Sequence, residues 1–415
     1  MLTPLNPLRT IAELKELRTL TSTHEGAQRV AWTETWDRAR AWMRDKLATL
    51  PVEVRLDEAG NLWATLPGAS PRALIIGSHI DSVPNGGWLD GALGLVAGLE
   101  VLRTIAARGT PPVTIRLVDW ADEEGRFGYS LLGSSAASGT LRPEHLLTLH
   151  DRNGITLPAM LTGYGVDVEQ MGQAGGELID AAAYLELHIE QGPVLETQGL
   201  PLATVTGTCG VERYKVIWHG QAAHSGSTPM NQRRDALAGA AKLTLALREI
   251  AHEVGDGAVC TSGSVVCSPG IATSVAENVV QMVDMRHHDS IKLARLLNRA
   301  QRASWQFAAE EHLNVTWERI YQIAPITFHP QLIELAEAAV IDTCGVYYHM
   351  TSGPLHDATE MARSGIPTVM LFVQSLRGIS HSYAEDTREE HLELAVRALA
   401  NLTDRVIEWL EQGGE

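Results

Sequence analysis

Five side chains that can bind a divalent metal ion are spread along this chain, each within a short polar or glycine-rich motif. They are His79, Asp90, Glu124, His188 and His381. Three imidazoles and two carboxylates, with no cysteine among them, suit Zn²⁺ or a similar ion such as Mn²⁺, Co²⁺ or Ni²⁺. One open catalytic ion rarely takes five protein ligands, whereas two ions that share a bridging carboxylate do. The set therefore predicts two divalent ions per chain, a metal-activated water, and hence hydrolysis.

Two further carboxylates stand beside these ligands. Asp81 follows His79 by two residues, so in an extended segment it points the same way and can fix the tautomer of the imidazole. Glu123 directly precedes Glu124, and adjacent carboxylates resist joint ionisation unless a cation is near. If Glu124 binds a metal ion, Glu123 can act as general base. The alternatives are a hydrogen-bonded surface pair at 79 and 81, and a solvated acidic loop over 122–124.

Two residues further along the chain could contact a substrate. His224 lies among small residues and could donate a hydrogen bond to a developing oxyanion. Its alternative is a loop histidine bonded to its own turn, which is rich in serine and threonine. Arg286 could hold a substrate carboxylate through two parallel hydrogen bonds. Its alternative is a salt bridge with Asp284 or Asp289.

Short apolar runs precede most of these motifs. Residues 73–76, 113–118, 184–187 and 368–373 are predicted strands, and residues 91–107 have the spacing of a buried helix. We expect residues 10–50 to be helical as well. Ligands just past the carboxyl ends of strands are typical of open α/β sheets. Strands that alternate with helices favour a mainly parallel sheet covered on both faces.

The stretch 205–323 contains none of the predicted ligands. It shows a strand, a helix, a strand, a helix and a strand, at 214–218, 235–252, 279–285, 291–312 and 314–320. We predict an inserted α+β domain over 205–323, and a discontinuous catalytic domain over 1–204 and 324–415. Two more helices, at 331–343 and 389–412, would complete the catalytic domain.

Composition narrows the classes of protein that fit. The chain has 415 residues, 45% of them apolar, which suits two folded domains. Its net charge of −17 argues against a nucleic-acid partner, which would need a basic face. No run of about 18 apolar residues could span a membrane, and the first residues do not read as a signal peptide. The four cysteines form no CxxC pair. We therefore expect a soluble, cytoplasmic protein.

Four motifs taken together resemble a known family. They are GSHIDSVPNGGWLDG at 77–91, DEEGRFG with LLGSSAASG at 122–139, ELHIEQGPVLE at 186–196 and GISHS at 378–382. They resemble the hydantoinase/carbamoylase family of amidases, within the aminoacylase-type dinuclear metallopeptidase superfamily. The family includes N-carbamoyl-L-amino acid hydrolases, allantoate amidohydrolases and β-ureidopropionase-like enzymes. The resemblance covers nearly the whole chain.

The resemblance implies a role for each predicted metal ligand. Asp90 would bridge two ions. His79 and His188 would bind one ion, and Glu124 and His381 the other.

It also implies roles around the substrate. Glu123 would be the general base, and Asp81 would support the first histidine. Gln191 would contact the scissile amide, and Arg286 the substrate carboxylate. The family forms a homodimer through the smaller domain, so His224 is expected to reach the active site of the partner subunit.

Three departures from the family pattern lie where the substrate would be read. Thr273 stands where the family usually carries an asparagine, and the motif after residue 124 is slightly shortened. The family's SGAGHDA is here SGPLHDA, which places Pro354 and Leu355 between Gly353 and His356. Proline has no N–H to donate, and leucine adds apolar bulk. We group Thr273, Gly353, Pro354 and His356 with the expected substrate-binding residues.

The predicted reaction is removal of the carbamoyl group from a small substrate with a carboxylate, foremost an N-carbamoyl-L-amino acid, giving the amino acid, CO₂ and ammonia. The alternatives are allantoate amidohydrolase or β-ureidopropionase activity, then an aminoacylase or dipeptidase. A non-catalytic metal-dependent binding protein would not need Glu123.

Overall fold

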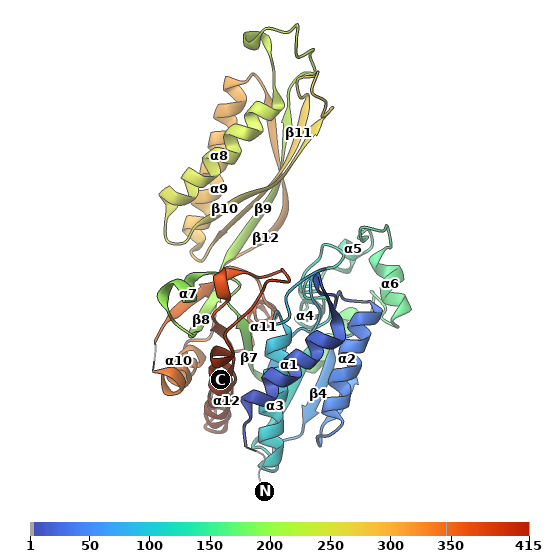
Figure 1. Cartoon of the computed structure of the whole chain (residues 1–415), viewed down its shortest axis with the longest axis vertical. Coiled ribbons are helices and arrows are strands. Elements are labelled where there is room, and N and C mark those ends of the chain that lie inside the picture. Colours follow the sequence, from blue (N-terminus) through green and yellow to red (C-terminus); the bar gives the residue numbers. More distant parts are fainter. Residues whose placement is uncertain (1–3, 346, 415) are drawn as a thin grey trace. The chain divides into compact units, whose positions relative to one another are not determined.

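The computed structural model describes residues 4–345 and 347–414. Its chain forms two compact units, Met1–Gly207 with Thr327–Glu415, and Thr208–Ile326 (Figure 1). The boundaries predicted from the sequence lie three residues before each of these. Each unit is described by itself.

The first unit is built on a mixed sheet whose central strands are parallel. The order of its strands is β13-β8-β15-β7-β5-β6-β4-β3, and β14 pairs with β8. Strand β5 is parallel to β6 and β7, and β15 is parallel to β7. The strands are β3 (Glu53–Leu56), β4 (Leu62–Leu66), β5 (Ser70–Ser78), β6 (Val113–Asp119), β7 (Ala181–Ile189), β8 (Leu202–Thr208), β13 (Ile326–Thr327), β14 (His349–Ser352) and β15 (Thr368–Val373). The predicted α/β class with a mainly parallel sheet is confirmed.

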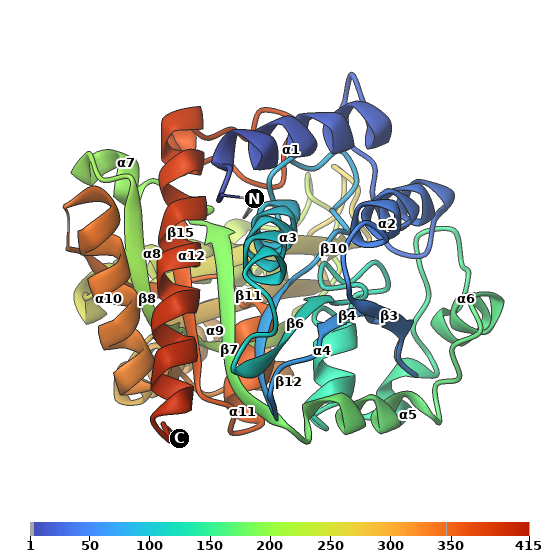
Figure 2. The same ribbon diagram turned by 90° about the horizontal axis from the view of Figure 1, so that it is seen from below.

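Helices pack on this sheet. Helices α3 and α12 both contact β6 and β7, and they cross in front of the strands in Figure 2. Helix α11 contacts β5, β7 and β15. The longer helices are α1 (Pro7–Thr21), α2 (Glu34–Leu47), α3 (Ala92–Ala107), α10 (Pro330–Cys344) and α12 (Glu389–Glu411), and the shorter ones are α4 (Leu132–Ala137), α5 (Pro143–Leu146), α6 (Leu157–Gly163), α7 (Val194–Gln198), α11 (Asp357–Arg363) and the 3₁₀ turns η1 (Met171–Leu178) and η3 (Leu376–Gly378).

The helical prediction for residues 10–50 was wrong in part. Between α1 and α2 the chain forms a short hairpin, β1 (Ser22–Thr23) and β2 (Gly26–Ala27). Gly26 has φ of +127°, which only glycine adopts without strain, and α2 begins at a new cap where the Thr33 hydroxyl accepts the N–H of Trp36. The apolar spacing continues across this break because both helices bury one face in the same unit.

The second unit is a four-stranded antiparallel sheet with two helices. Its strand order is β10-β11-β9-β12, and α8 and α9 contact the sheet (Figure 1). Trp218 and Val279 are fully buried between sheet and helices. The elements are β9 (Gly210–His219), η2 (Met230–Gln232), α8 (Ala236–Val254), β10 (Val259–Ser268), β11 (Asn278–His287), α9 (Ser290–Glu310) and β12 (Asn314–Ile323). The sequence missed β10, which is mostly exposed and rich in serine, so it lacks an apolar alternation.

Among the described residues, no helix is both long enough and apolar enough to cross a bilayer.

Candidate metal centre

The sheet register brings three motifs to one edge. Ser78 pairs with Asp119, and Ile76 pairs with Leu185, so β5, β6 and β7 end side by side. His79 directly follows β5, and Glu123 and Glu124 follow β6. His188 was expected just past a strand, but β7 continues to Ile189 because His188 itself pairs with Phe372 of β15. The carboxyl ends of parallel strands thus collect the polar side chains.

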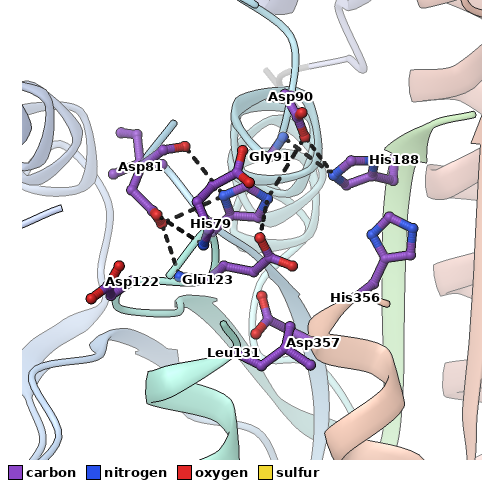
Figure 3. A network of polar contacts seen from close by, with 12 residues as sticks. His79, Asp81, Asp90, Gly91, Asp122, Glu123, Leu131, His188, His356 and Asp357 are labelled. Carbon is purple, nitrogen blue, oxygen red and sulfur yellow. Dashed lines mark hydrogen bonds and ion pairs between the residues drawn. The ribbon is translucent and has the colours of Figure 1, made fainter. Parts of the chain in front are cut away.

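His79, Asp90 and His188 form the first group that could hold a metal ion, with one ligand atom from each lying within 4.8 Å of the others. Asp90 Oδ1 lies 3.1 Å from His188 Nε2 and 3.9 Å from His79 Nε2 (Figure 3). All three side chains are buried. Gly91 follows with φ of +63°, and a Cβ there would lie 2.3 Å from the His79 carbonyl oxygen. Only glycine therefore fits between the two segments.

Asp90, Glu124 and His381 form the second group. Here Asp90 uses its other oxygen, since Oδ2 lies 3.3 Å from His381 Nε2, which is 3.4 Å from Glu124 Oε2. Glu124 Oε1 is buried and has no hydrogen-bond partner among the described residues. A buried carboxylate oxygen without a donor is costly, and a cation would satisfy it. The donor set therefore fits two ions that share the Asp90 carboxylate.

Asp81 contacts both the segment of His79 and the segment of Glu123 and Glu124. Its carboxylate accepts the backbone N–H groups of Glu123 at 3.3 Å and Glu124 at 3.2 Å. His79 Nδ1 lies 3.5 Å from Asp81 Oδ1 and 3.2 Å from the Asp81 carbonyl oxygen. A hydrogen on Nδ1 bonded to either oxygen leaves Nε2 of His79 facing the site. Glu123 Oε2 lies 3.6 Å from that Nε2.

Burial and crowding shift the acidities of the site. Burial raises the pKa of Glu123 well above its ordinary value, with nearby His79 opposing and Glu124 adding to the shift. Burial, with the negative charge of Asp90, raises the pKa of Glu124 to about 8. A hydrogen bond with Asp90 raises the pKa of His381 to about 9. Burial would raise the pKa of Asp90, but hydrogen bonds with His188 and His381 hold it well below its ordinary range. Without a cation, the site thus retains protons that a metal ion would displace.

The carboxylate of Asp90 has two more neutral neighbours. Gln191 Nε2 donates to Asp90 Oδ2 at 3.0 Å, and the Ser380 hydroxyl lies 3.1 Å from the same oxygen. Gln191 Oε1 is buried without a partner among the described residues. Gln191 and His381 both have positive φ, of +59° and +54°, a strained conformation that clusters at functional sites.

Three of the predicted substrate residues, Gly353, Pro354 and His356, lie between β14 and α11. His356 is buried, its ring is 4.4 Å from that of His188, and its Nε2 has no hydrogen-bond partner among the described residues. Gly353 and Pro354 precede it, and the Pro354 carbonyl accepts the Ser352 hydroxyl at 2.7 Å. His356 thus lies beside His188, one of the predicted metal ligands.

Sequence reasoning missed Glu186, which forms a third group of possible metal ligands with His188 and His356, all three of them buried. Its carboxylate accepts the Ala358 N–H at 2.8 Å and lies 3.1 Å from the Tyr184 hydroxyl. The available signal was its place two residues before His188 in an extended strand, where alternate side chains share a face.

His224, Thr273 and Arg286 belong to the second unit and not to the unit that carries the five predicted ligands. The Ser225 N–H donates to the Thr273 carbonyl at 3.0 Å, so the loop after His224 pairs with the Thr273 segment. His224 Nδ1 accepts the Gly226 N–H at 3.1 Å, which is the alternative of a histidine bonded within its own turn. Arg286 Nε donates to Asp284 Oδ1 at 2.8 Å, which is one of the salt bridges weighed for it.

Comparison with known proteins decides the family. The model of "Peptidase family M20/M25/M40" matches residues 75–405. The chain belongs to this family. Among M20/M25/M40 relatives, it is 35% identical to an N-carbamoyl-L-amino acid amidohydrolase of Geobacillus stearothermophilus, over 90% of this chain and 92% of the relative. It is 31% identical to an allantoate amidohydrolase of Bacillus subtilis, over 91% of this chain and 92% of that one.

Solved structures agree with this placement in the M20/M25/M40 family. An amidase of the hydantoinase/carbamoylase family from Burkholderia multivorans is similar with a TM-score of 0.84 and 29% identity, covering 96% of this chain and 97% of that one. The resemblance predicted from the four motifs is confirmed.

Proposed function

We propose that this chain is a metal-dependent amidohydrolase that removes the carbamoyl group from a small substrate carrying a carboxylate, foremost an N-carbamoyl-L-amino acid. The products would be the amino acid, CO₂ and ammonia. One observation carries the proposal: Asp90 turns Oδ1 to one group of possible ligands and Oδ2 to another. The names of the relatives, N-carbamoyl-L-amino acid amidohydrolases among them, support the choice of substrate.

Five residues would hold two divalent ions, of Zn²⁺, Mn²⁺, Co²⁺ or Ni²⁺. His79 and His188 would bind one, Glu124 and His381 the other, and Asp90 both. Such ions supply Lewis-acid polarisation and a water of lowered pKa.

The chain's own residues would handle the proton and the substrate. Glu123 is buried beside these ligands, and its raised pKa suits a group that takes a proton from the attacking water and passes it to the leaving nitrogen. Asp81 holds the backbone of Glu123 in place. Gln191 would contact the scissile amide, for which its unpartnered Oε1 is suited. His356 would line the pocket with Gly353, Pro354 and Thr273.

The second unit would contribute the rest of the substrate site. Arg286, held by Asp284, would bind the substrate carboxylate in the forked geometry typical of arginine. His224 would stabilise the developing oxyanion. We further propose a homodimer through Thr208–Ile326, in which His224 acts in the partner subunit, and a cytoplasmic location without nucleic-acid or membrane partners.

Allantoate amidohydrolase is the second candidate function. It is favoured by the relatives of that name in Bacillus subtilis and Escherichia coli, each 31% identical to this chain. Pro354 and Leu355 would lie in the substrate site, and the added apolar bulk of Leu355 keeps an acyl or peptidyl substrate as a further candidate.

Ammonia release by the Mn²⁺- or Zn²⁺-loaded protein tests the proposal. The panel contains N-carbamoyl-L-amino acids, 3-ureidopropionate and allantoate, with N-acetyl amino acids and dipeptides followed by free-amine release. Turnover of an N-carbamoyl-L-amino acid that disappears in Glu123→Gln supports the proposal, and the fastest substrate ranks the candidates. Amine release from acyl or peptidyl substrates alone would contradict it. Ion binding without any turnover would identify a binding protein.

A further inference from the structure

The carboxylate of Glu385 lies behind Asp90 and joins two segments that carry metal ligands. Glu385 is only 2% exposed and follows His381 by four residues. Its Oε1 accepts the backbone N–H groups of Leu89 and Asp90, each at 3.0 Å, across 295 residues of sequence in the second case. One carboxylate oxygen thus fixes the backbone at the shared ligand.

The other oxygen of Glu385 reaches the side chain of Asp90 through a serine. Ser380 Oγ lies 2.9 Å from Glu385 Oε2 and 3.1 Å from Asp90 Oδ2. A hydroxyl has one hydrogen, so Ser380 donates to one of these two carboxylates at a time. Gln191 Nε2 lies 3.2 Å from the same hydroxyl. Since Ser380 directly precedes His381, this contact also sets where that ligand stands.

The surroundings are shaped to admit this carboxylate. A Cβ on Gly87 would lie 1.9 Å from the Glu385 carboxyl, so any larger residue there would displace it. Arg29, in the segment between β2 and α2, is fully buried and donates to the Ile80 carbonyl at 2.7 Å and the Gly87 carbonyl at 3.5 Å. Burial lowers the pKa of Arg29, and Glu385 is the strongest of the charges that oppose this. The glycine at position 87 therefore leaves space for the buried carboxylate of Glu385, and the positive charge of Arg29 compensates its negative charge.

We propose that Glu385 is a positioning residue that holds the shared ligand Asp90 in register with His381, and so keeps the second ligand group assembled. The inference rests on the proposed two-ion centre. Partners that orient metal ligands typically contribute a factor of about 10–100 to metal affinity. Loss of Glu385 would weaken the ion between Asp90, Glu124 and His381 more than the ion between His79, Asp90 and His188.

Equilibrium dialysis against buffered Co²⁺, with metal counted per chain by mass spectrometry, tests this without any substrate. The variants are Glu385→Ala, Glu385→Gln and Ser380→Ala. In Glu385→Gln the single amide oxygen can still accept the backbone N–H groups of Leu89 and Asp90. The amide nitrogen that replaces the other oxygen cannot accept a hydrogen bond from Ser380. The control is Glu100→Gln, because Glu100 is equally buried and bonded to backbone and arginine but touches no ligand segment. Circular dichroism and urea unfolding of the metal-free proteins report folding.

We expect two ions in the wild type and in Glu100→Gln, and a loss of second-ion affinity of about 10–100-fold in Glu385→Ala. Glu385→Gln and Ser380→Ala should each show a smaller loss in the same direction, and they decide the matter if Glu385→Ala does not fold. Wild-type affinity at both sites in the folded variants would overturn the proposed role of Glu385 but not the two-ion centre. A wild-type chain that binds fewer than two ions would overturn the two-ion centre and this inference together.

Discussion

The salt bridge between Arg40 and Asp119 offers the sharpest test of how this site is supported. Both side chains are buried, 4% and 2% exposed, and Arg40 Nε donates to Asp119 Oδ2 at 2.7 Å. The same guanidinium donates to the carbonyl oxygens of Gly60 at 2.6 Å and Asp119 at 3.1 Å. Asp119 Oδ1 accepts at 2.8 Å the N–H of Ile80, which directly follows the predicted ligand His79. We predict that Arg40→Met destabilises the first unit and loosens this ligand segment.

The magnitude follows from the buried charge that remains. Removing one partner of a buried pair costs roughly 3–5 kcal/mol. The cost has a ceiling, because Asp119 can take up a proton. Protonating an aspartate costs about 1.4 kcal/mol for each pH unit above its ordinary pKa. The destabilisation caused by the unpaired carboxylate therefore cannot exceed about 1.5 kcal/mol at pH 5 or about 5.5 kcal/mol at pH 8.

The sign of the pH dependence is therefore fixed. Burial already raises the pKa of Asp119, and Arg40 opposes this. Without Arg40 the pKa of Asp119 rises further, so the variant keeps its stability below the ordinary pKa and loses it as pH rises towards the raised value. The destabilisation should shrink by on the order of 2 kcal/mol between pH 8 and pH 5.

Urea unfolding of the metal-free protein, followed by tryptophan fluorescence and circular dichroism, measures the effect. Arg40 lies 4.0 Å from the ring of Trp36, so one of the ten tryptophans of the chain stands directly beside the altered residue. Arg40→Lys, which keeps the charge, and Arg40→Met with Asp119→Asn, which removes the stranded carboxylate, are the controls. The double variant should recover a large part of the loss. A loss below about 1 kcal/mol at pH 8, or one that grows on acidification, would refute the reasoning.

Three further predictions concern the metal centre. Glu123→Gln should lower kcat by a factor of about 10²–10⁴ in steady-state assays, because the amide keeps the shape of the side chain but cannot take a proton. Dialysis should show unchanged ion binding. An unchanged kcat would show that Glu123 is not the general base. Burial raises the pKa of Glu124 to about 8 and a carboxylate partner raises that of His381 to about 9, so ion affinity should rise from pH 6 to pH 9. The pKa values of His79 and His188 are raised as well, so calorimetry in two buffers should then find roughly two or more protons released per chain at pH 7, and no release would contradict the shifts. Gly91→Ala should abolish ion binding seen by dialysis, because its Cβ would lie 2.3 Å from the His79 carbonyl at a φ of +63°, and wild-type binding would disprove this packing.

Much of the fold was predictable because its signals are local. The apolar runs at 113–118 and 368–373 match β6 and β15 closely, because a run of five or six consecutive apolar residues predicts a buried strand. Exposed β10 carries no such signal, and the hairpin between α1 and α2 interrupts a spacing that both helices share. The fold class and the family followed from residues near one another in sequence.

The sequence by itself determined which residue types stand at the ends of the strands, and hence the class of chemistry. Only the tertiary structure decided which of these side chains lie in contact with one another. It turned the two oxygens of Asp90 to different groups, placed Glu186 beside His356, and set Glu385 behind Asp90, 295 residues away in the sequence. Those partnerships depend on strand register and on close approach at glycine. Neither is encoded at a fixed spacing, because the pairing of distant segments is settled only when the whole sheet forms.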